Sequence, residues 1–540
     1  MEKACKWCKS EFVIDDQDMV FYKKVGPVFD GVKYEVAPPT LCPDCRQQRR
    51  CFTRNERKFY IRKCDLSGRN MVTVYAPEFS GKVYDHDSWH GDEWDPCDYS
   101  RDFDFERGFF EQFQELALEC PRINLIAMNS ENSTYTNHSA YNKNCFMCIN
   151  TGYSEDLFYC TNYNLKNKDC GDCMEIQECE RCYFCTGAQR CHFSTYLFEC
   201  EGMTDSHFCF DCRNCESCFG CYNLRRKKYC IYNEQYSKED YLKKMEELMP
   251  KTWPETMTLF DELMEMKKEK AINKSLWIEK CQNCSGDQLD NNKNVKDSYY
   301  VYGSEDCRYC YDAGDMKDCY DVTEPYNEEL FYEVQASFHG YHNIACCKSL
   351  ESKNSLYCYY CWQCEDCFGC FGMRKKKYCI FNKQYTREEY EKMVPRIIEH
   401  MRETAEWGEF FPPEDCAFGY NETIAFEYYP MSREEVLARG WKWRDQQEEV
   451  KSEEGDSIVK CEVTNRSFRI IKAEADFYEK MKLPLPGRHP DERHYMRMSL
   501  RNPRRVRKSE CTKCGIYIET SCPEDVKKVY CEKCYLEEVY

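Results

Sequence analysis

Small or apolar residues recur at every third position in the middle of the chain, and this pattern repeats with a period of twelve from Cys170 onward. The residues between these positions are polar or aromatic. Buried positions of an α-helix recur every 3.6 residues, so the spacing excludes a helix. It predicts a narrow β-solenoid in which every third side chain points inward. The first inward column is Cys170, Cys182, Ser194, Ser206, Cys218 and Cys230.

A second copy of the pattern lies 149 residues further along the chain. The motif Cys218-Phe-Gly-Cys221 returns as Cys367-Phe-Gly-Cys370, and a basic run follows each. The inward column of the second copy is Cys310, Val322, Val334, Cys346, Cys358 and Cys370. Because valine cannot bind a metal, we interpret most repeat cysteines as packing residues that fit a narrow interior. A wider coil, with two 12-residue units in each turn, fits the same spacing.

Metal binding by some of the repeat cysteines is the alternative. The candidates for such a site are the densest clusters of the two copies: Cys212, Cys215, Cys218, Cys221, Cys361, Cys364, Cys367 and Cys370. The basic runs Arg225–Lys228 and Arg374–Lys377 close the two copies. We expect these runs to cap the open end of each solenoid, with contact to phosphate as the alternative.

Cysteine pairs at both ends of the chain have the spacing of zinc ligands. The two sets are Cys5, Cys8, Cys42 and Cys45 near the N-terminus, and Cys511, Cys514, Cys531 and Cys534 near the C-terminus. Two Cys-x-x-Cys pairs at such separations predict a zinc ribbon, in which each pair sits on a tight knuckle and four thiolates surround the ion. We therefore expect two structural zinc ions.

The two ends are copies of one tandem module. Cys5 aligns with Cys461 after a shift of 456 residues, and Cys64 aligns with Cys511 after a shift of 447. Each copy has kept one zinc site and lost the other. The lost sites are Cys64, Ser67, Asp85 and Ser88 in the N-terminal copy, and Cys461, Thr464, His489 and Glu492 in the C-terminal copy. We expect both to be degenerate ribbons held by their apolar cores. The alternative for the C-terminal copy is a metal held by Cys461, His489 and Glu492 with one outside ligand.

The most basic stretches of the chain lie between the two ribbons of each module, at 46–63 and 488–508. The arginines that we expect to contact nucleic acid are Arg46, Arg49, Arg50, Arg54, Arg57, Arg501, Arg504, Arg505 and Arg507. Guanidinium groups suit phosphates and stacked bases, and the clusters contrast with a net charge of −19 for the whole chain. The alternative is that these arginines pair with the acidic solenoid surface of the same chain.

These features predict a mainly β chain with accessory helices, in which two cysteine-rich solenoids are flanked by tandem zinc-ribbon modules. The predicted parts are a module at 1–95, a helical connection at 96–140, the first solenoid at 141–236, a helical linker at 237–285, the second solenoid at 286–385, a helical and aromatic linker at 386–457, and a module at 458–540. Ser237 and Thr386 are each followed three residues later by an acidic residue, which predicts a helix start after each solenoid.

No sequence motif points to catalysis, so we expect a non-enzymatic protein. The chain contains no GxxxxGK[ST], no GxGxxG after a strand, no HExxH and no GxSxG. A metal or hydrolytic site at Asp85, His86, Asp87 and His90 is a minor alternative. The start of the chain has no apolar leader, and no stretch reaches 18 consecutive apolar residues. With 44 cysteines in 540 residues, we expect a cytoplasmic protein that holds metal rather than disulfides and has no membrane segment.

Seven short motifs are spread over nearly the whole chain. They are Cys42-Pro-Asp-Cys45-Arg, Arg54-Asn-Glu-Arg, Asp102-Phe-Asp-Phe105, Phe109-Phe-Glu-Gln-Phe113, Cys218-Phe-Gly-Cys221, Phe410-Phe-Pro and Tyr420-Asn-Glu-Thr423. Together they resemble a cysteine-rich zinc-ribbon family of candidate-phyla-radiation bacteria (Patescibacteria). The resemblance implies the architecture and a bacterial cytosol, and it implies no activity. The loss of one zinc site in each tandem departs from the pattern of that family.

Three functions fit these observations. The first is a non-enzymatic zinc-binding scaffold whose arginine-rich modules engage nucleic acid or a nucleoprotein. The second is a scaffold that binds protein partners through the solenoid faces. The third is a thiol protein that stores metal in the solenoids. Metal content separates the third from the others, because a store would hold ten or more ions per chain and the two ribbons would hold two.

Overall fold

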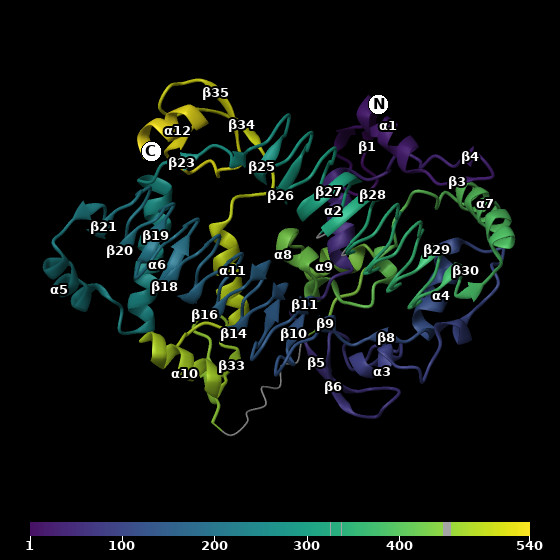
Figure 1. The fold of residues 1–540 in the computed structure, drawn as a ribbon, viewed down its shortest axis with the longest axis horizontal. Helices are drawn as coiled ribbons and strands as arrows, with labels where there is room; N and C mark the ends of the chain where they lie inside the picture. Colours follow the sequence, from purple (N-terminus) through teal and green to yellow (C-terminus); the bar gives the residue numbers. More distant parts are fainter. Residues whose placement is uncertain (324–325, 336, 446–454) are drawn as a thin grey trace. The chain divides into compact units, whose positions relative to one another are not determined.

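The computed structural model describes residues 1–323, 326–335, 337–445 and 455–540, so that 446–454 of the predicted 386–457 linker lie outside it. The described chain is mixed rather than mainly β, because the charged segments outside the repeats fold into helices of up to 17 residues. The chain divides into two compact units (Figure 1). Unit 1 is Met1–Leu125 with Trp277–Asp445, and unit 2 is Ile126–Leu276 with Gln446–Tyr540. Each unit therefore combines one repeat region with the zinc module from the opposite end of the chain.

The first repeat region, in unit 2, is built from parallel strands that pair at an offset of twelve positions, or of thirteen where the paired segments flank Cys160. Cys170 pairs with Cys182, and Cys182 pairs with Ser194. Bridges between the strands keep the offset, as for Met174 and Thr186. This offset is one full turn of the coil, which excludes the wider coil of two such units. The strands are β9 (Ala127–Met128), β10 (Thr136–Asn137), β11 (Ser139–Ala140), β12 (Cys148–Ile149), β13 (Thr151–Gly152), β14 (Glu155–Phe158), β15 (Asn164–Leu165), β16 (Lys168–Gly171), β17 (Glu180–Tyr183), β18 (His192–Phe198), β19 (His207–Phe210), β20 (Glu216–Phe219) and β21 (Lys228–Ile231).

The second repeat region, in unit 1, also pairs at an offset of twelve, except in its first turn, where the offset is eleven. Tyr299 pairs with Tyr311, and Cys367 pairs with Cys379. The strands are β24 (Ile278–Glu279), β25 (Gly286–Asp290), β26 (Ser298–Tyr302), β27 (Tyr311–Tyr320), β28 (Tyr326–Tyr332), β29 (Glu365–Phe368) and β30 (Lys377–Ile380). An antiparallel partner strand follows the last parallel strand of each region: β22 (Glu234–Gln235) in the first and β31 (Lys383–Gln384) in the second. These short hairpins cover the exposed strand edge at the end of each ladder.

A residue with left-handed backbone precedes the inward residues of both coils. Asp169 and Asp172, directly before Cys170 and Cys173, both have φ of 51°. This conformation costs an ordinary residue roughly 1–2 kcal/mol, and Gly, Asn and Asp adopt it most readily. Each such residue bends the chain, so that one turn of the coil has four bends and four inward side chains. The Asp, Asn and Gly residues one position before the cysteines were the sequence signal for these bends.

Inward side chains also complete the hydrogen bonding inside the coil. The backbone N–H of Cys185 donates to Cys173 Sγ (3.5 Å), and that of Ser206 donates to Ser194 Oγ (3.2 Å). The Cys173 thiol in turn donates to the carbonyl of Gly171 (3.2 Å). A thiol or hydroxyl thus satisfies the N–H that lies one turn later in the coil, which an apolar side chain cannot do. Cysteine and serine recur here because they are small and can both donate and accept.

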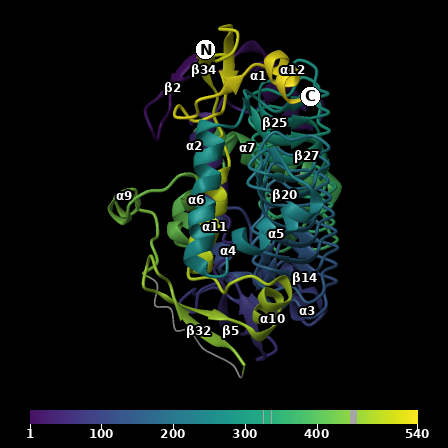
Figure 2. The same ribbon diagram turned by 90° about the vertical axis from the view of Figure 1, so that its left-hand side faces the viewer.

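Each repeat region is covered by a helix. In the sequence, that helix comes shortly before the other repeat region. These helices are α4 (Phe109–Glu119) in unit 1 and α6 (Trp253–Glu269) in unit 2. Phe109 of α4 meets Phe368 of the second region, with ring centroids 5.6 Å apart. Helix α6 lies along the strands of the first region (Figure 2). Its Phe260 meets Phe184 of that region, with ring centroids also 5.6 Å apart. The aromatic faces of these helices therefore pack on the outer aromatic residues of the coils.

Both predicted helix starts after the repeats are confirmed. Ser237 caps α5 (Lys238–Leu248) and Thr386 caps α7 (Arg387–Glu403), each by accepting the backbone N–H of an acidic residue in the first turn. Two short helices follow the second region, α8 (Ile424–Tyr428) and α9 (Arg433–Ala438). No helix in the described part of the chain combines the length and apolarity needed to cross a bilayer.

The two zinc modules are built from matching elements. In unit 1 these are β1 (Glu2–Ala4), β2 (Glu11–Val13), α1 (Asp16–Val25), β3 (Val28–Phe29), β4 (Val32–Lys33), α2 (Pro43–Phe52), β5 (Tyr60–Lys63), β6 (Asn70–Thr73), β7 (Val83–Tyr84) and α3 (His86–His90). In unit 2 they are β32 (Ser457–Lys460), β33 (Ser467–Ile470), α10 (Lys472–Met481), α11 (Pro490–Leu500), β34 (Arg507–Glu510), β35 (Tyr517–Thr520), β36 (Val529–Tyr530) and α12 (Glu532–Val539). Parallel pairs tie each module to its unit, β7 with β8 (Arg122–Ile123) and β36 with β23 (Asn273–Lys274).

Candidate metal centres and module docking

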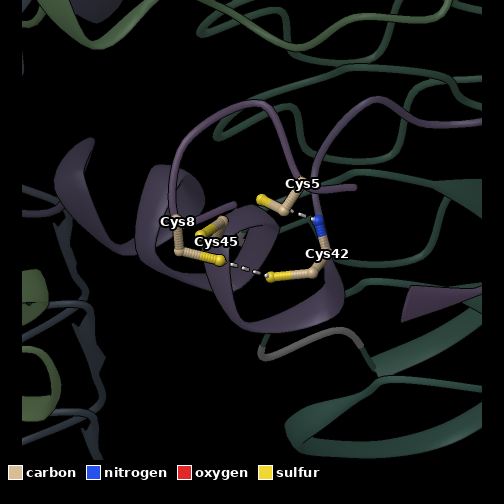
Figure 3. A group of neighbouring side chains, drawn as sticks. All are labelled: Cys5, Cys8, Cys42 and Cys45. Carbon is tan, nitrogen blue, oxygen red and sulfur yellow. Dashed lines mark hydrogen bonds between the residues drawn. The ribbon is translucent and has the colours of Figure 1, made fainter. Parts of the chain in front are cut away.

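The four N-terminal zinc ligands come together in unit 1. The sulfur atoms of Cys5, Cys8, Cys42 and Cys45 all lie within 4.8 Å of one another. The first two come from the turn after β1 and the last two from the start of α2, and their side chains point into one common space (Figure 3). Cys8 Sγ lies 3.7 Å from Cys42 Sγ, and the Cys42 N–H donates to Cys5 Sγ at 3.3 Å. Four thiols at these distances fit one tetrahedral zinc ion.

The C-terminal ligands form an equivalent site in unit 2. Cys511, Cys514, Cys531 and Cys534 also have their sulfur atoms within 4.8 Å of one another. The Cys531 N–H donates to Cys511 Sγ at 3.3 Å, the same contact as in the first site. Among the residues that the structure describes, these two groups are the ones that gather three or more close metal ligands. The two four-cysteine sites therefore fit two structural zinc ions, as predicted.

Hydrogen bonds favour the thiolate form at both sites. The thiol and backbone N–H of Cys45 lower the pKa of Cys42 to about 5, against the opposing effect of burial. Burial raises the pKa of Cys511, but the N–H donors of Cys531 and Cys514 outweigh it and bring the pKa to about 6. Both sites also include the start of a helix, where the helix dipole stabilises negative charge. One cysteine of each site is therefore a thiolate, the form that binds zinc, near neutral pH, whereas the pKa of Cys45 and of Cys534 is raised.

The prediction that every cysteine pair sits on a knuckle is right for the first pair of each site and wrong for the second. Cys5 and Cys8 lie in the tight connection between the antiparallel strands β1 and β2. Cys42 instead caps α2, and Cys45 lies in its first turn. In unit 2, Cys531 caps α12 in the same way. Each site thus joins one knuckle to one helix N-terminus, because the residues after the second pair form a helix.

In the lost site of unit 1, a carboxylate network joins the positions of the missing ligands. The Asp85 N–H donates to Cys64 Sγ at 3.3 Å, as in the intact sites. Asp85 Oδ2 accepts hydrogen bonds from the hydroxyls of Ser67 (2.6 Å) and Ser88 (3.0 Å), and Arg69 pairs with Oδ1 (3.0 Å). Partial burial raises the pKa of Asp85, but these hydrogen bonds outweigh it and hold the pKa below its usual value. The knuckle and helix persist here because the replacement side chains bind one another.

In the lost site of unit 2, a guanidinium group lies beside the position of the missing ligands. The Asp491 N–H donates to His489 Nδ1 at 3.1 Å. Arg466 Nη2 lies 3.3 Å from Asp491 Oδ2 and 3.4 Å from His489 Nε2. A positive charge at this distance disfavours a second cation. Neither lost site gathers three close metal ligands among the described residues.

The repeat cysteines that were candidates for extra metal sites are buried. Cys212, Cys215, Cys218, Cys221, Cys361, Cys364, Cys367 and Cys370 are at most 1% exposed. Cys212 Sγ donates to the Phe210 carbonyl (3.5 Å), and Cys361 Sγ donates to the Cys370 carbonyl (3.4 Å). Burial raises the pKa of Cys212 and of Cys370 well above the usual value, so these thiols are neutral. The contacts support packing and internal hydrogen bonding at these eight positions and give no support to metal.

Three of the arginines expected to contact nucleic acid are buried in unit 1. Arg46, Arg49 and Arg50 of α2 are at most 5% exposed. Arg46 Nε pairs with Asp321 Oδ2 (2.7 Å), and Arg49 Nη2 pairs with Glu333 Oε1 (2.7 Å), in neighbouring turns of the second repeat region. Arg50 Nη2 adds a contact to Asp321 Oδ1 at 3.4 Å. These contacts match the alternative of pairing within the chain, and in this placement the three side chains do not face a nucleic acid.

The same docking recurs in unit 2. Arg493 and Arg497 of α11 align with arginines of α2 after the shift of 447 residues. Both pair with Asp172, Arg497 at 2.7 Å, and all three side chains are at most 1% exposed. Asp172 precedes Asp321 by 149 residues, which is the offset between the repeats. Sequence analysis missed both aspartates, although the two shared offsets together were a signal that could have found them.

The remaining predicted arginines contact carboxylates or carbonyls, or are exposed. Arg54 pairs with Glu56, Arg57 with Glu427 (2.6 Å), Arg501 with Glu175 (3.0 Å), and Arg507 donates to the Cys522 carbonyl (3.0 Å). Arg504 is half-buried and Arg505 is exposed. Among the predicted arginines that the structure describes, Arg505 of the C-terminal module is therefore the one exposed to a polyanion.

The first residue of each basic run fastens the module to the last turn of the coil. In unit 1, Arg374 donates to the carbonyls of Gly91 and Trp94, both at 3.1 Å. In unit 2, Arg225 donates to the Tyr535 hydroxyl at 2.7 Å. The two arginines lie 149 residues apart, so the contact is duplicated with the repeat. These bonds support the capping role of the runs over contact with phosphate.

The minor candidate site at the end of the lost ribbon has two histidines. The rings of His86 and His90 lie 4.6 Å apart, and His90 also packs 4.6 Å from Trp362. Burial lowers the pKa of His90 to about 4. Within the described chain no third ligand atom joins the pair, so the arrangement gives no support to a metal or hydrolytic site.

Comparison with known families bears on the first module. Residues 1–54 match a family described as a probable treble clef domain. The match covers β1 to α2, which hold all four ligands of the first zinc site. It covers a tenth of the chain and so characterises this module alone. No curated protein matches the chain.

Proposed function

We propose that the protein is a non-enzymatic scaffold in which two zinc-bearing modules each clamp one β-solenoid. The observation that carries the proposal is the duplicated buried interface, Arg46 with Asp321 in unit 1 and Arg493 with Asp172 in unit 2. Buried ion pairs lose much of their attraction to desolvation and serve mainly to specify one geometry. A chain that keeps two such interfaces holds two coils in defined positions against their modules. A reducing compartment such as the cytosol is part of the proposal, because zinc thiolates and thiol-lined coils need reduced cysteine.

The outer face of the solenoids supports a protein partner. One column along each coil alternates in charge, with Lys143, Glu155, Lys168 and Glu180 in the first and Lys293, Glu305, Lys317 and Glu329 in the second. Neighbours in these columns pair, as for Lys168 with Glu155 (3.1 Å) and Lys293 with Glu305 (2.5 Å). Such a face has no excess of positive charge for a polyanion, but it suits a protein surface with a matching alternation of charge.

Engagement of nucleic acid is a second proposal, supported by exposed basic residues of the C-terminal module. Arg505 and Lys508 are exposed beside the intact zinc site of unit 2. Zinc modules with clustered arginine and lysine are typical of nucleic-acid contact. This proposal depends on those side chains and not on the buried arginines of α2 and α11.

Two measurements separate these proposals. Metal analysis of the purified chain is expected to give two zinc ions, whereas ten or more would favour a metal store. Binding to a random RNA and DNA pool is then measured against salt concentration, with an Arg505→Ala/Lys508→Ala double variant as the matched control. Retention at low salt that the double variant abolishes would replace the protein-binding proposal with the nucleic-acid one. No retention supports the protein scaffold.

A further inference from the structure

The first turn of the second repeat region contains a Cys-x-x-Cys pair that differs from every other inward pair of that coil. Cys281 and Cys284 lie between β24 and β25 and are only half-buried. The inward cysteines that follow are fully buried; they are Cys307, Cys310, Cys319, Cys346, Cys358, Cys361, Cys364, Cys367, Cys370 and Cys379, at most 1% exposed. The first turn has a neighbouring turn on one side only, so solvent reaches its inward side chains.

Both thiols make the hydrogen bonds expected of an inward residue. Cys281 Sγ accepts the Asn292 N–H (3.4 Å) and donates to the Glu279 carbonyl (3.1 Å). Cys284 Sγ donates to the Gln282 carbonyl at 3.3 Å. Both side chains lie against the same inward cluster, in one turn at the open end of the coil, and the charge of Cys281 acts on Cys284.

The first repeat region shows that hydroxyls suffice for this structural task. Ser130 Oγ accepts the Asn142 N–H (3.2 Å), and Ser133 Oγ accepts the Cys145 N–H (3.0 Å), in the first turn of that coil. Ser130 also donates to the carbonyl of Met128, two residues earlier in the chain, at 3.1 Å. Cys281 and Cys284 likewise donate to the carbonyls two residues before them. Two serines thus stand at the hydrogen-bonding positions that two cysteines hold in unit 1. The coil does not need sulfur there, so the dithiol adds chemistry that a pair of hydroxyls lacks.

We propose that Cys281 and Cys284 form a binding site for a thiophilic ion of low coordination number, separate from the two zinc sites. Two neighbouring thiols suit ions that take two sulfur ligands, such as Cu(I) or an organic As(III) group. They do not suit zinc, which requires four ligands. With phenylarsine oxide the As–O bond and two S–H bonds break, two As–S bonds form and one water leaves. Arsenic stays trivalent, so no oxidant or reductant is needed.

The surroundings favour such an ion over peroxide chemistry. Burial raises the pKa of Cys284, and the charge of neighbouring Cys281 adds to the rise, so the thiol is protonated at neutral pH. Peroxides react with thiolate, whereas a soft ion displaces the proton as it binds. The Lys296 amine, bound to Asn283 Oδ1 at 2.7 Å, lies close by and compensates the charge of the sulfur ligands.

The test is native mass spectrometry of the full zinc-loaded chain with phenylarsine oxide, followed by peptide mapping. We expect one phenylarsenic group per chain on the peptide with Cys281 and Cys284, and two zinc ions retained. Cys281→Ser, which copies the residue type of the first region, is expected to lower labelling at least about tenfold. Cys361→Ser removes one thiol of a buried pair with the same spacing and should leave labelling unchanged. A second arm with Cu(I) and a competing chelator shows whether the site prefers the arsenical or the metal.

Two results would overturn the proposal. One is an adduct that maps to other cysteines or appears only as zinc is released. The other is an adduct that survives in the Cys281→Ser/Cys284→Ser double variant. Mapping on the unmodified chain decides the question even if a variant fails to fold.

Discussion

Units 1 and 2 contain the same parts and differ in where the zinc site lies relative to the docking helix. We call α2 and α11 the docking helices, because their arginines contact the aspartates of the repeat regions. In unit 1 the docking helix α2 starts at the zinc ligand Cys42, so that the same helix carries zinc ligands and docking arginines. In unit 2 the docking helix α11 is capped by His489, in a set that keeps one cysteine, Cys461, and the intact site lies at α12. Both docking helices keep the buried arginine–aspartate contact.

This difference indicates which part of the module is indispensable. Among the described residues, the start of the docking helix carries a four-cysteine group in one unit only, whereas the arginines and their aspartate are present in both. The interface can therefore form without an adjacent ion, provided that the rest of the module folds. In unit 1 alone, zinc and docking are coupled through a single helix.

The largest effect is expected from removing the zinc site of unit 1. Cys42→Ser is predicted to unfold the start of α2 and to free the arginines from Asp321 and Glu333, because structural zinc sites contribute about 10 kcal/mol or more. Hydrogen exchange followed by mass spectrometry should show loss of protection in α2 and retained protection in α11. Cys511→Ser is the matched control and should affect α12 without affecting α11. Equal loss in α2 and α11 would contradict the comparison.

The next effect concerns the buried aspartates. Asp172→Asn leaves two buried guanidinium groups with less charge compensation and is predicted to cost about 3–5 kcal/mol of unfolding free energy. Asp321→Asn should cost less, because Glu333 lies within 4 Å of Arg46, Arg49 and Arg50, whereas the carboxylate that remains in unit 2, Glu474, contacts Arg493 at 3.5 Å. Urea unfolding of both variants measures the difference, with Glu305→Gln, a half-buried residue of the outer face, as control. A larger loss for Asp321→Asn would show that the two interfaces are not equivalent.

A third prediction uses a position at which the coils differ. Glu328 is 3% exposed inside the second coil, where the first coil has Cys179. Burial raises the pKa of Glu328 to about 9, against the smaller effect of the Gly340 N–H bonded to it at 3.0 Å. The folded state thus favours the protonated acid, so stability is highest below the unfolded pKa near 4.5 and falls as pH rises toward 9.

Glu328→Gln removes this titration and should stabilise unit 1 at pH 7 by on the order of 3 kcal/mol. Denaturant unfolding at pH 5, 7 and 9 tests it, and the gain should grow with pH. Cys179→Gln in the first coil is the comparison, because no titrating acid is removed there. A gain that is independent of pH would show that Glu328 does not titrate in this range.

The smallest effect is expected on the charged face. Lys228 pairs with Glu216 (2.6 Å) and Lys377 pairs with Glu365 at equivalent places in the two coils, and both lysines are exposed. Exposed pairs are screened by solvent, so Lys228→Ala and Lys377→Ala should each shift the melting temperature by no more than about 1–2 °C. Calorimetry of both variants checks this. A larger shift in one coil only would identify a structural role for that face.

Local spacing made several features predictable. The 12-residue period excluded a helix and predicted a coil, because side-chain direction in a repeated backbone follows sequence position alone. The two four-cysteine sets were predictable for a similar reason, because two Cys-x-x-Cys pairs together supply the four ligands of one zinc ion. The helix starts at Ser237 and Thr386 depend on contacts within one turn and were also correct.

Features that depend on contacts between distant segments were not predictable in this way. The burial of Arg46 and Arg50 follows from Asp321, which lies in a different repeat region far along the chain. The sequence contains both charged residues, but their positions along the chain do not indicate that they are in contact. A basic helix has the same residue pattern whether it contacts phosphate or a carboxylate. The mixed secondary structure was underestimated because long charged helices were counted as accessories to the coils.

Residue type at short or regular spacing was enough to predict the repeat, the thiol-lined interior and the zinc ligands. Contacts between distant segments place each zinc module on the repeat region at the far end of the chain and bury most of its arginines there. That placement rests on shape and charge complementarity between surfaces, in which desolvated guanidinium groups need carboxylates at matched positions. The tertiary fold also puts two of the repeat cysteines at an open end, where a thiol can meet a ligand from solution.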